Sequence, residues 1–183
     1  MSLTYSEMLE LGEKLPEFEL LNTVDNKFYN SNQLSAQKGK LIMFICNHCP
    51  YVIHYHDQII DISRKYSSNI DFVAISSNDA TKYHADSPEK MTELAEKLGF
   101  SFPYLHDETQ EIAKKYQAVC TPEFYLFNKD NSLIYRGRFD DSSPGSGKEK
   151  TGKDLIDAID NFISGKEISE KQYPSMGCNI KWK

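Results

Sequence analysis

The sequence predicts an α/β domain in which a central mixed β-sheet is flanked by helices on both faces. Two short apolar runs rich in β-branched residues, "LIMFIC" and "IDFVAIS", are separated by a segment with apolar residues at helical spacing. Later in the chain, two further apolar runs are separated by "NKDNS", a combination typical of a β-hairpin. Strand–helix–strand order followed by a closing hairpin implies a sheet with both parallel and antiparallel pairs.

Four strands are predicted, because short apolar runs bounded by polar residues are typical of buried strands. Their ranges are Leu41–Cys46, Ile70–Ser76, Phe124–Phe127 and Leu133–Gly137. An extended or hairpin segment around "PEFELLN" is expected to precede them.

Four helices are predicted around these strands. The first spans Pro50–Tyr66, and the second opens at Ser87-Pro88-Glu89 with a cap, a proline at the first helical position and an early acid. Asp107 is expected to cap a third helix in "ETQEIAKKY". Lys153–Ser164 reads as a last amphipathic helix that Gly165 ends.

The chain of 183 residues is interpreted as one domain, residues 1–183, because it is long enough for one core and shows no internal repeat. The segment Asp140–Gly152, "DDSSPGSGKEKTG", is expected to be a mobile loop. The tail, residues 166–183, contains a Trp, an Ile and a Cys, and it is therefore expected to pack back onto the domain.

Composition excludes several classes of function. The formal net charge of −6 argues against nucleic acid as a partner, because phosphate binding needs an excess of Lys and Arg. No apolar run reaches the roughly 20 residues that span a membrane. The N-terminus "MSLTYSEMLELGEK" lacks the basic and apolar regions of a secretory signal, so a cytoplasmic location is expected.

The segment "FICNHCPY" carries the strongest functional signal. Pro50 is favoured at a first helical position, which places Cys49 at the helix N-cap. Unpaired backbone N–H groups and the helix dipole stabilise an anion there, so the thiol of Cys49 should have a lowered pKa and react as thiolate. His48, when protonated, would favour the thiolate further. Cys46 lies three residues earlier, within reach of a disulfide.

Two other interpretations of this motif remain open. A single buried cysteine such as Cys46 is often only a packing residue. A structural zinc site would need two more ligands, and neither a second Cys-x-x-Cys nor a His-x-x-x-His motif exists. His54 and His56 are interpreted as solvated helix residues, and no resident metal or other cofactor is expected. A copper carrier using Cys46, Cys49 and a histidine is the alternative from a different class of function, since thiolates suit Cu(I).

The segment "AVCTPEFYLF" supports redox chemistry. Thr121-Pro122 directly precedes a predicted strand and is a candidate cis peptide bond. We expect it to lie against the cysteine pair and to hold a backbone edge open, with which the extended chain of a substrate could pair.

Together these motifs resemble the thioredoxin-like redoxin superfamily, of the alkyl hydroperoxide reductase and thiol-specific antioxidant type. The segments "LGEKLPEFELLNTVDNKFYNSNQL", "KLIMFICNHCP", "DFVAISSND", "FPYLHDETQEIAKKYQ" and "CTPEFYLFNKDNSLIYRGRFDD" follow in the order of that family. The chain is most similar to the peroxiredoxin-like group with a Cys-x-x-Cys motif. The resemblance implies a thioredoxin-like fold and thiol–disulfide or antioxidant chemistry.

The sequence also departs from both branches of this superfamily. Thioredoxins attack with the first cysteine of the pair, whereas here the second, Cys49, falls at the helix cap. Peroxiredoxins place their attacking cysteine before a proline, as in Cys49-Pro50, but carry a peroxide-orienting threonine where this chain has Cys46. The arginine that stabilises the peroxiredoxin thiolate is replaced near Thr121-Pro122. Loss of both groups should slow attack on peroxide.

The sequence therefore predicts a thiol–disulfide oxidoreductase. Cys49 attacks, Cys46 resolves the mixed disulfide and His48 tunes the pKa, while Thr121 and Pro122 present the substrate edge. Cys178 and Cys120 are named as further candidate resolving thiols. A thiol peroxidase that uses Cys49 is the alternative. The expected partners are protein or small-molecule disulfides and thiols, peroxides in the alternative, and a reductant such as thioredoxin or a low-molecular-weight thiol.

Overall fold

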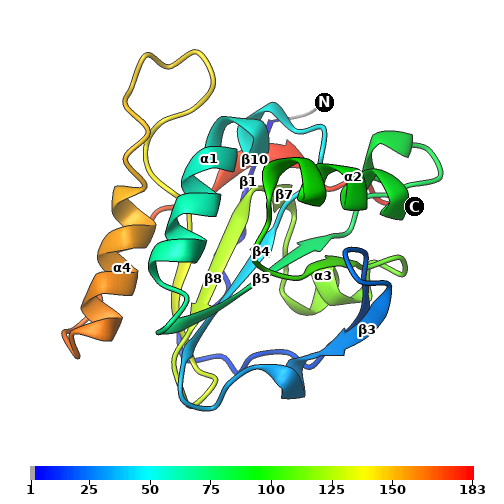
Figure 1. Cartoon of the computed structure of the whole chain (residues 1–183). Coiled ribbons are helices and arrows are strands. Elements are labelled where there is room, and N and C mark those ends of the chain that lie inside the picture. Colours follow the sequence, from blue (N-terminus) through cyan, green and yellow to red (C-terminus); the bar gives the residue numbers. More distant parts are fainter. Residues whose placement is uncertain (1–2) are drawn as a thin grey trace.

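The computed structural model describes residues 3–183, and a seven-stranded mixed sheet forms its centre (Figure 1). The strand order is β3-β2-β6-β5-β4-β8-β9. These strands are β2 (Glu19–Asn22), β3 (Lys27–Asn30), β4 (Gly39–Phe44), β5 (Ile70–Ser76), β6 (Tyr104–His106), β8 (Glu123–Phe127) and β9 (Leu133–Gly137). The pairs β4–β5 and β5–β6 are parallel and the other pairs are antiparallel, so the predicted mixed sheet is confirmed.

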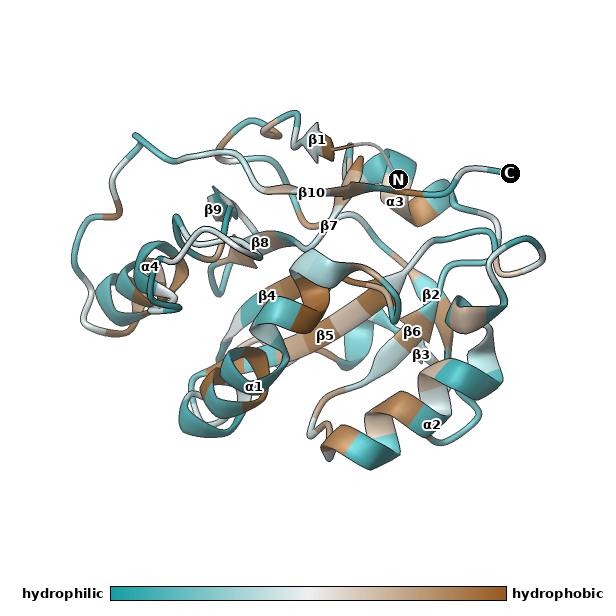
Figure 2. Cartoon of the chain, turned by 90° about the horizontal axis from the view of Figure 1, so that it is seen from above, coloured by the Kyte–Doolittle hydropathy of each residue, from teal (hydrophilic) through white to brown (hydrophobic). Residues whose placement is uncertain are grey.

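Four α-helices cover both faces of this sheet. They are α1 (Pro50–Lys65), α2 (Pro88–Leu98), α3 (Glu111–Lys115) and α4 (Lys153–Ile163). Figure 2 shows α1, α2 and α4 on one side of the sheet and α3 on the other, with the central strands β4 and β5 strongly hydrophobic. Side chains from β4 alternate between two hydrophobic clusters, one under each layer of helices. This arrangement confirms the predicted α/β class.

The helix starts follow from local sequence signals, with one correction. Cys49 is the N-cap of α1 and Ser87 is the N-cap of α2, as predicted. The cap of α3 is Gln110 and not Asp107. Asp107 instead accepts hydrogen bonds from the amides of Ile112 and Ala113, at 3.4 and 2.9 Å, so its buried carboxylate still binds the first turn of α3.

A second, three-stranded sheet lies beside the start of α1, and the sequence reasoning missed it. Its order is β1-β10-β7, with β1 (Leu3–Tyr5), β10 (Met176–Asn179) and β7 (Cys120–Thr121). The predicted packing of the tail is confirmed, because β10 belongs to it. These strands are two to four residues long, too short for an alternating pattern to stand out.

The loop after β9 is fixed at its beginning. Asp140 and Ser142 are buried, and the hydroxyl of Tyr55 on α1 donates to a carboxylate oxygen of Asp140 at 2.8 Å. The rest of the loop, residues 143–151, is largely exposed, and its mobility stays a prediction. Within residues 3–183, no helix is both long and apolar enough to cross a membrane.

Candidate redox site

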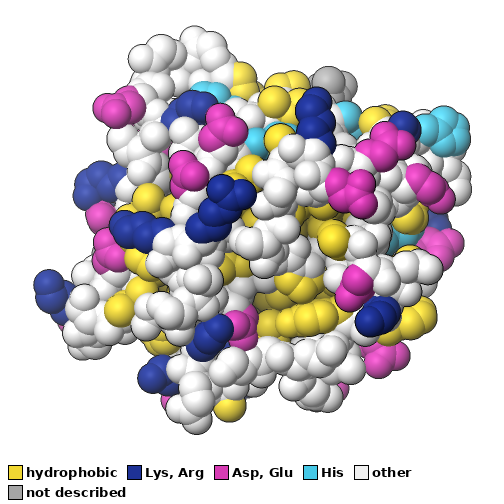
Figure 3. All heavy atoms as spheres, viewed as in Figure 1, with side chains coloured by type: hydrophobic (Ala, Val, Ile, Leu, Met, Phe, Trp, Pro, Cys, Tyr) yellow, Lys and Arg dark blue, Asp and Glu magenta, His cyan; other side chains and the backbone are white. Residues whose placement is uncertain are grey.

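The cysteine pair lies in the connection between β4 and α1. Strand β4 ends at Phe44 rather than at the predicted Cys46, so Cys46 lies in the loop and Cys49 caps the helix. Both thiols are buried, with 2% of Cys46 and none of Cys49 exposed. Along the upper edge of the face in Figure 3, where α1 begins, histidine and hydrophobic side chains lie together. The predicted N-cap position of Cys49 is therefore confirmed, whereas Cys46, predicted as the last residue of the strand, lies two residues beyond the end of β4.

Cys49 is the thiol that the surroundings ionise. A hydrogen bond from the Cys46 thiol lowers the pKa of Cys49 to about 5; burial opposes this shift, while Cys178, the Val52 amide and Thr121 contribute to it. The amide is one of the unpaired N–H groups in the first turn of α1, which favours an anion. Cys49 is therefore a thiolate near neutral pH.

Cys46 has the opposite character. Its hydrogen bond to Cys49 and its burial raise the pKa of Cys46 well above the usual value for a thiol. Its Sγ lies 3.4 Å from the hydroxyl oxygen of Thr121, which partly offsets this shift. The pair thus holds one thiolate and one protonated thiol that donates to it.

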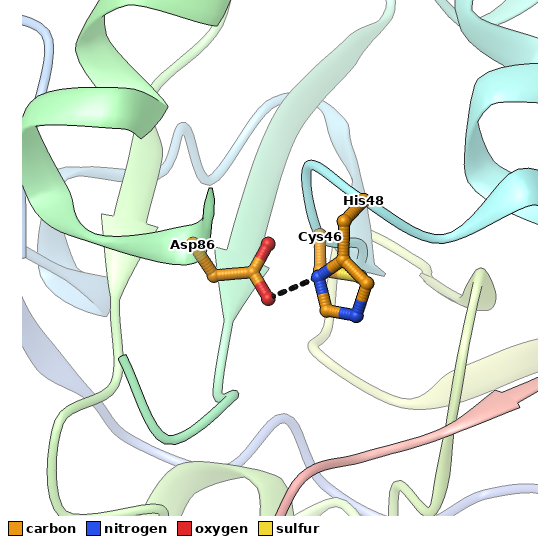
Figure 4. A group of neighbouring side chains, drawn as sticks. All are labelled: Cys46, His48 and Asp86. Atoms are coloured by element: carbon orange, nitrogen blue, oxygen red, sulfur yellow. Dashed lines mark ion pairs between the residues drawn. The ribbon is translucent and has the colours of Figure 1, made fainter. Parts of the chain in front are cut away.

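A buried carboxylate, Asp86, stands behind the loop of the cysteine pair, and the sequence reasoning did not identify it. Figure 4 shows Asp86 facing Nδ1 of His48, at 2.7 Å, with Cys46 beside them. The two Asp86 carboxylate oxygens also accept hydrogen bonds from the Asn47 amide and from Nδ2 of Asn78, both at 2.8 Å. Asp86 therefore holds the backbone between the two cysteines in place.

Asp86 and His48 shift each other's protonation. The carboxylate raises the pKa of His48, and partial burial opposes this effect. Burial also opposes ionisation of Asp86, but His48 and Asn78 hold the pKa of Asp86 below its usual value. The His48 ring stacks on Tyr83, with 5.7 Å between the ring centroids. Asp86 lies in a short 3-10 helix, His84–Asp86, and reaches the cysteine loop only through folding. No local sequence motif therefore marks it as part of the site.

Contrary to the prediction, the two histidines on α1, His54 and His56, are not fully solvated. His54 is partly buried, and its Nε2 lies 3.0 Å from the Ser142 hydroxyl. His56 is also partly buried. Burial lowers the pKa of both side chains. Both therefore contribute to packing of α1 and belong to no ligand set with Cys46 or Cys49 in the described residues.

Thr121 and Pro122 lie against the cysteine pair. The Thr121–Pro122 peptide bond is cis, as predicted. Sγ of Cys49 lies 3.2 Å from the Thr121 carbonyl oxygen, which accepts a hydrogen bond when Cys49 is protonated. However, the expected open edge is not open, because Thr121 belongs to β7 and β7 is paired with β10. The tail of the chain occupies the position that the sequence reasoning assigned to a substrate.

The two remaining cysteines differ in position. Cys178 on β10 lies opposite Thr121 in the strand register, and its burial and the neighbouring Cys49 raise its pKa. Cys120 is fully buried, and its thiol donates to the carboxylate of Glu123 at 3.7 Å. Burial raises the pKa of Cys120. Cys178 thus lies near Cys49, whereas Cys120 is directed to Glu123.

One group of side chains has the spacing of a metal site. Ligand atoms of Cys46, His48 and Asp86 lie within 4.8 Å of one another. The set differs from that of the copper alternative, since it includes a carboxylate in place of Cys49. Sulfur, nitrogen and oxygen donors together suit Zn²⁺ better than Cu(I), which prefers thiolates.

The fold and the pair of thiols show that this protein is thioredoxin-like and has the kind of site found in oxidoreductases. The chain belongs to the Redoxin family, whose model matches residues 10–155. An uncharacterized conserved protein from Geobacillus kaustophilus is similar at 46% identity and a TM-score of 0.97, over 100% of this chain and 97% of that one.

Two further solved structures are similar. A hypothetical protein from Sinorhizobium meliloti 1021 is 36% identical, with a TM-score of 0.95 over 98% of each chain. A secreted disulfide oxidoreductase from Mycobacterium tuberculosis is 14% identical, with a TM-score of 0.62 over 78% of this chain and 94% of that one, and it supports the fold alone. Among curated proteins, no significant match was found.

Proposed function

We propose that this protein is a thiol–disulfide oxidoreductase in which Cys49 attacks and Cys46 resolves. The observation that carries the proposal is the division of roles within the pair. Cys49, with a pKa of about 5, is a nucleophile near neutral pH, while Cys46 keeps its proton. A thiolate beside a protonated thiol is the starting state for exchange with a disulfide.

The reaction proceeds in two exchanges. The Cys49 thiolate attacks a substrate disulfide, which forms a mixed disulfide and releases one substrate thiolate. Cys46 then gives up its proton and attacks Sγ of Cys49, so the second substrate thiolate leaves and the Cys46–Cys49 disulfide forms. The substrate gains two electrons and the proton of Cys46, and the protein is oxidised by two electrons. A thiol reductant, such as a dithiol protein or a low-molecular-weight thiol, reverses the oxidation of the pair.

In this mechanism His48 and Asp86 hold the loop between the two cysteines in position. Asp86 binds the Asn47 amide and faces His48, which fixes the chain between the two cysteines. Because Asp86 raises the pKa of His48, the imidazolium form persists to higher pH and favours negative charge on the neighbouring thiolate. A reducing compartment such as the cytoplasm suits a pair that works as thiols.

A thiol peroxidase is the second candidate, because Cys49-Pro50 at the start of α1 is also the arrangement that attacks a peroxide. Peroxide attack needs donors that stabilise charge on the departing oxygen, each worth about 2–4 kcal/mol in the transition state. Position 46 carries a thiol in place of the expected threonine hydroxyl. We therefore propose weak peroxidase activity beside dithiol–disulfide exchange.

The test compares insulin reduction with hydrogen peroxide consumption, both with the same thiol reductant. Wild-type protein should reduce insulin disulfides, whereas Cys46→Ser should turn over far more slowly and form a mixed disulfide on Cys49 in place of the Cys46–Cys49 disulfide. Cys120→Ser is the matched control, because Cys120 contacts Glu123 and not Cys49. Rapid peroxide consumption without insulin reduction would favour the peroxidase. Tight Zn²⁺ or Cu(I) binding without either activity would favour a metal carrier.

A further inference from the structure

Strand β10 fills the backbone edge beside the redox site. It pairs antiparallel with β7, so that Cys178 lies opposite Thr121 and Asn179 lies opposite Cys120. The pairing continues beyond the strand, where the amide of Ile180 donates to the Val119 carbonyl at 2.9 Å. An extended substrate chain beside the cysteine pair would need these same backbone groups. The C-terminal segment of the protein thus takes the place of a substrate strand.

Strand β10 packs closely against β7, and the C-terminal segment is held by further contacts with β1 and Asn78. A Cβ atom on Gly177 would lie 2.0 Å from the Thr121 carbonyl oxygen, so only glycine permits this approach of the two backbones. On its other edge β10 pairs with β1, with Leu3 opposite Cys178. The amide of Lys181 donates to Oδ1 of Asn78 at 2.8 Å. The substrate-like position is therefore built into the fold.

Cys178 is the residue that this strand presents to the nucleophile. Thr121 lies next to all three cysteines of the site: its hydroxyl lies 3.4 Å from Sγ of Cys46, its carbonyl oxygen lies 3.2 Å from Sγ of Cys49, and its register partner is Cys178. Cys49 and Cys178 also affect each other's protonation, since Cys178 contributes to the lowered pKa of Cys49 and Cys49 contributes to the raised pKa of Cys178. Cys49 thus touches two thiols, one from its own loop and one from β10.

Resting on the function proposed above, we infer that Cys178 is a third redox residue, which forms a disulfide with Cys49 as an internal substrate. Because β10 occupies the backbone edge of β7, a substrate must reach Cys49 without pairing to that edge, which favours small disulfides over extended protein segments. Both thiols are buried, with 5% of Cys178 and none of Cys49 exposed, so a substrate disulfide reaches them only after local opening of the site.

The step needs only the substrate of the proposed function. A small disulfide, RSSR, reacts with the Cys49 thiolate to give a Cys49–S–S–R mixed disulfide and an RS⁻ thiolate. Cys178 loses its proton and attacks Sγ of Cys49, so a Cys49–Cys178 disulfide forms. The bond between Cys49 and the R sulfur breaks, and the second R group leaves as a thiolate that takes the proton of Cys178. Cys46 performs the same step from the other side in the proposed cycle.

Oxidised glutathione and the Cys46→Ser variant provide the test. In this variant the glutathione adduct on Cys49 should be transient and should give way to a Cys49–Cys178 disulfide, identified by peptide mass mapping. In Cys46→Ser/Cys178→Ser the adduct should persist at least about tenfold longer, because an intramolecular thiol competes at an effective concentration of roughly millimolar. Cys46→Ser/Cys120→Ser is the control and should behave like Cys46→Ser.

The outcomes separate this inference from the function on which it rests. An equally persistent adduct with and without Cys178 would overturn the inference, while the wild-type Cys46–Cys49 disulfide and insulin reduction would leave the proposed function standing. Absence of any reaction at Cys49 in wild-type protein would overturn both. Circular dichroism of each serine variant shows whether it is folded, and the adduct lifetime in the folded Cys46→Ser protein decides the question if the double variant does not fold.

Discussion

Nδ1 of His48 lies 2.7 Å from a carboxylate oxygen of Asp86, and the carboxylate is completely buried. The two residues are 38 positions apart in the sequence, so their contact joins the cysteine loop to the short 3-10 helix that precedes α2. Removing a partner of this buried carboxylate would be costly, because the charge would stay buried without the interactions that compensate for its lost hydration.

Asp86→Asn should lower the pKa of His48, because the carboxylate is the main cause of its increase. An NMR titration of the imidazole measures the change. A raised histidine pKa contributes stability below the unfolded value of 6.5, and this contribution is lost as pH rises through the folded pKa. The variant should therefore lose the part of its stability that His48 contributes at acid pH. Asp79→Asn is the matched control, because Asp79 pairs with Lys82; equal shifts in both variants would contradict the assignment.

Cys46→Ala should raise the pKa of Cys49 above about 5, because the hydrogen bond from Cys46 is the largest cause of its decrease. Cys46→Ser keeps a donor at this position and should leave the pKa close to that of wild type. The ultraviolet absorbance of the thiolate, followed against pH, measures the difference. The same pKa in the alanine and serine variants would show that the helix terminus and not Cys46 stabilises the thiolate.

Gly177→Val should expose Cys49 by displacing β10, since the new Cβ would lie 2.0 Å from the Thr121 carbonyl oxygen. Cys49 is fully buried in the structure, so alkylation by iodoacetamide requires local opening. Its rate should increase about tenfold, which corresponds to opening made easier by about 1.4 kcal/mol. Glu170→Val, in the exposed part of the tail, should leave the rate unchanged. An unchanged rate in Gly177→Val would mean that β10 is not what covers the nucleophile.

Glu123→Gln should remove a pH dependence of stability. Burial raises the pKa of Glu123 from 4.5 to about 7, so the unfolded chain releases this proton at lower pH than the folded chain does. Wild-type stability should therefore fall between pH 4.5 and about 7, by on the order of 3 kcal/mol. Urea denaturation at several pH values measures this fall, which Glu123→Gln should lack. The exposed Glu13→Gln is the control, and a fall retained in Glu123→Gln would assign the effect to another group.

The sequence predicted those parts of the site that depend on neighbours along the chain. Pro50 places Cys49 at a helix start, and the three-residue spacing brings Cys46 to it, so both positions could be derived from local rules. Likewise, periodicity indicated the long helices and the strands β5, β8 and β9, with small differences at their ends.

The parts that the sequence did not predict depend on long-range contacts. Asp86 has no helix, strand or motif signal, and its role follows only from its distance to His48 after folding. The edge at Thr121 was expected to be open because of the Thr121-Pro122 motif, and β10, which covers it, was missed because so short a strand lacks a periodic pattern. Its pairing partner, Cys178, lies 57 residues further along the chain, where no local rule could place it.

The pairing of Leu3 with Cys178 has a consequence for biosynthesis. Translation produces Cys46 and Cys49 long before β10 emerges from the ribosome, so during elongation the nucleophile exists without the strand that covers it. Contacts between strands so far apart in the sequence are also slow to form, because they close a long loop. The reactive thiol is therefore covered only in the last stage of folding, when β10 docks between β1 and β7.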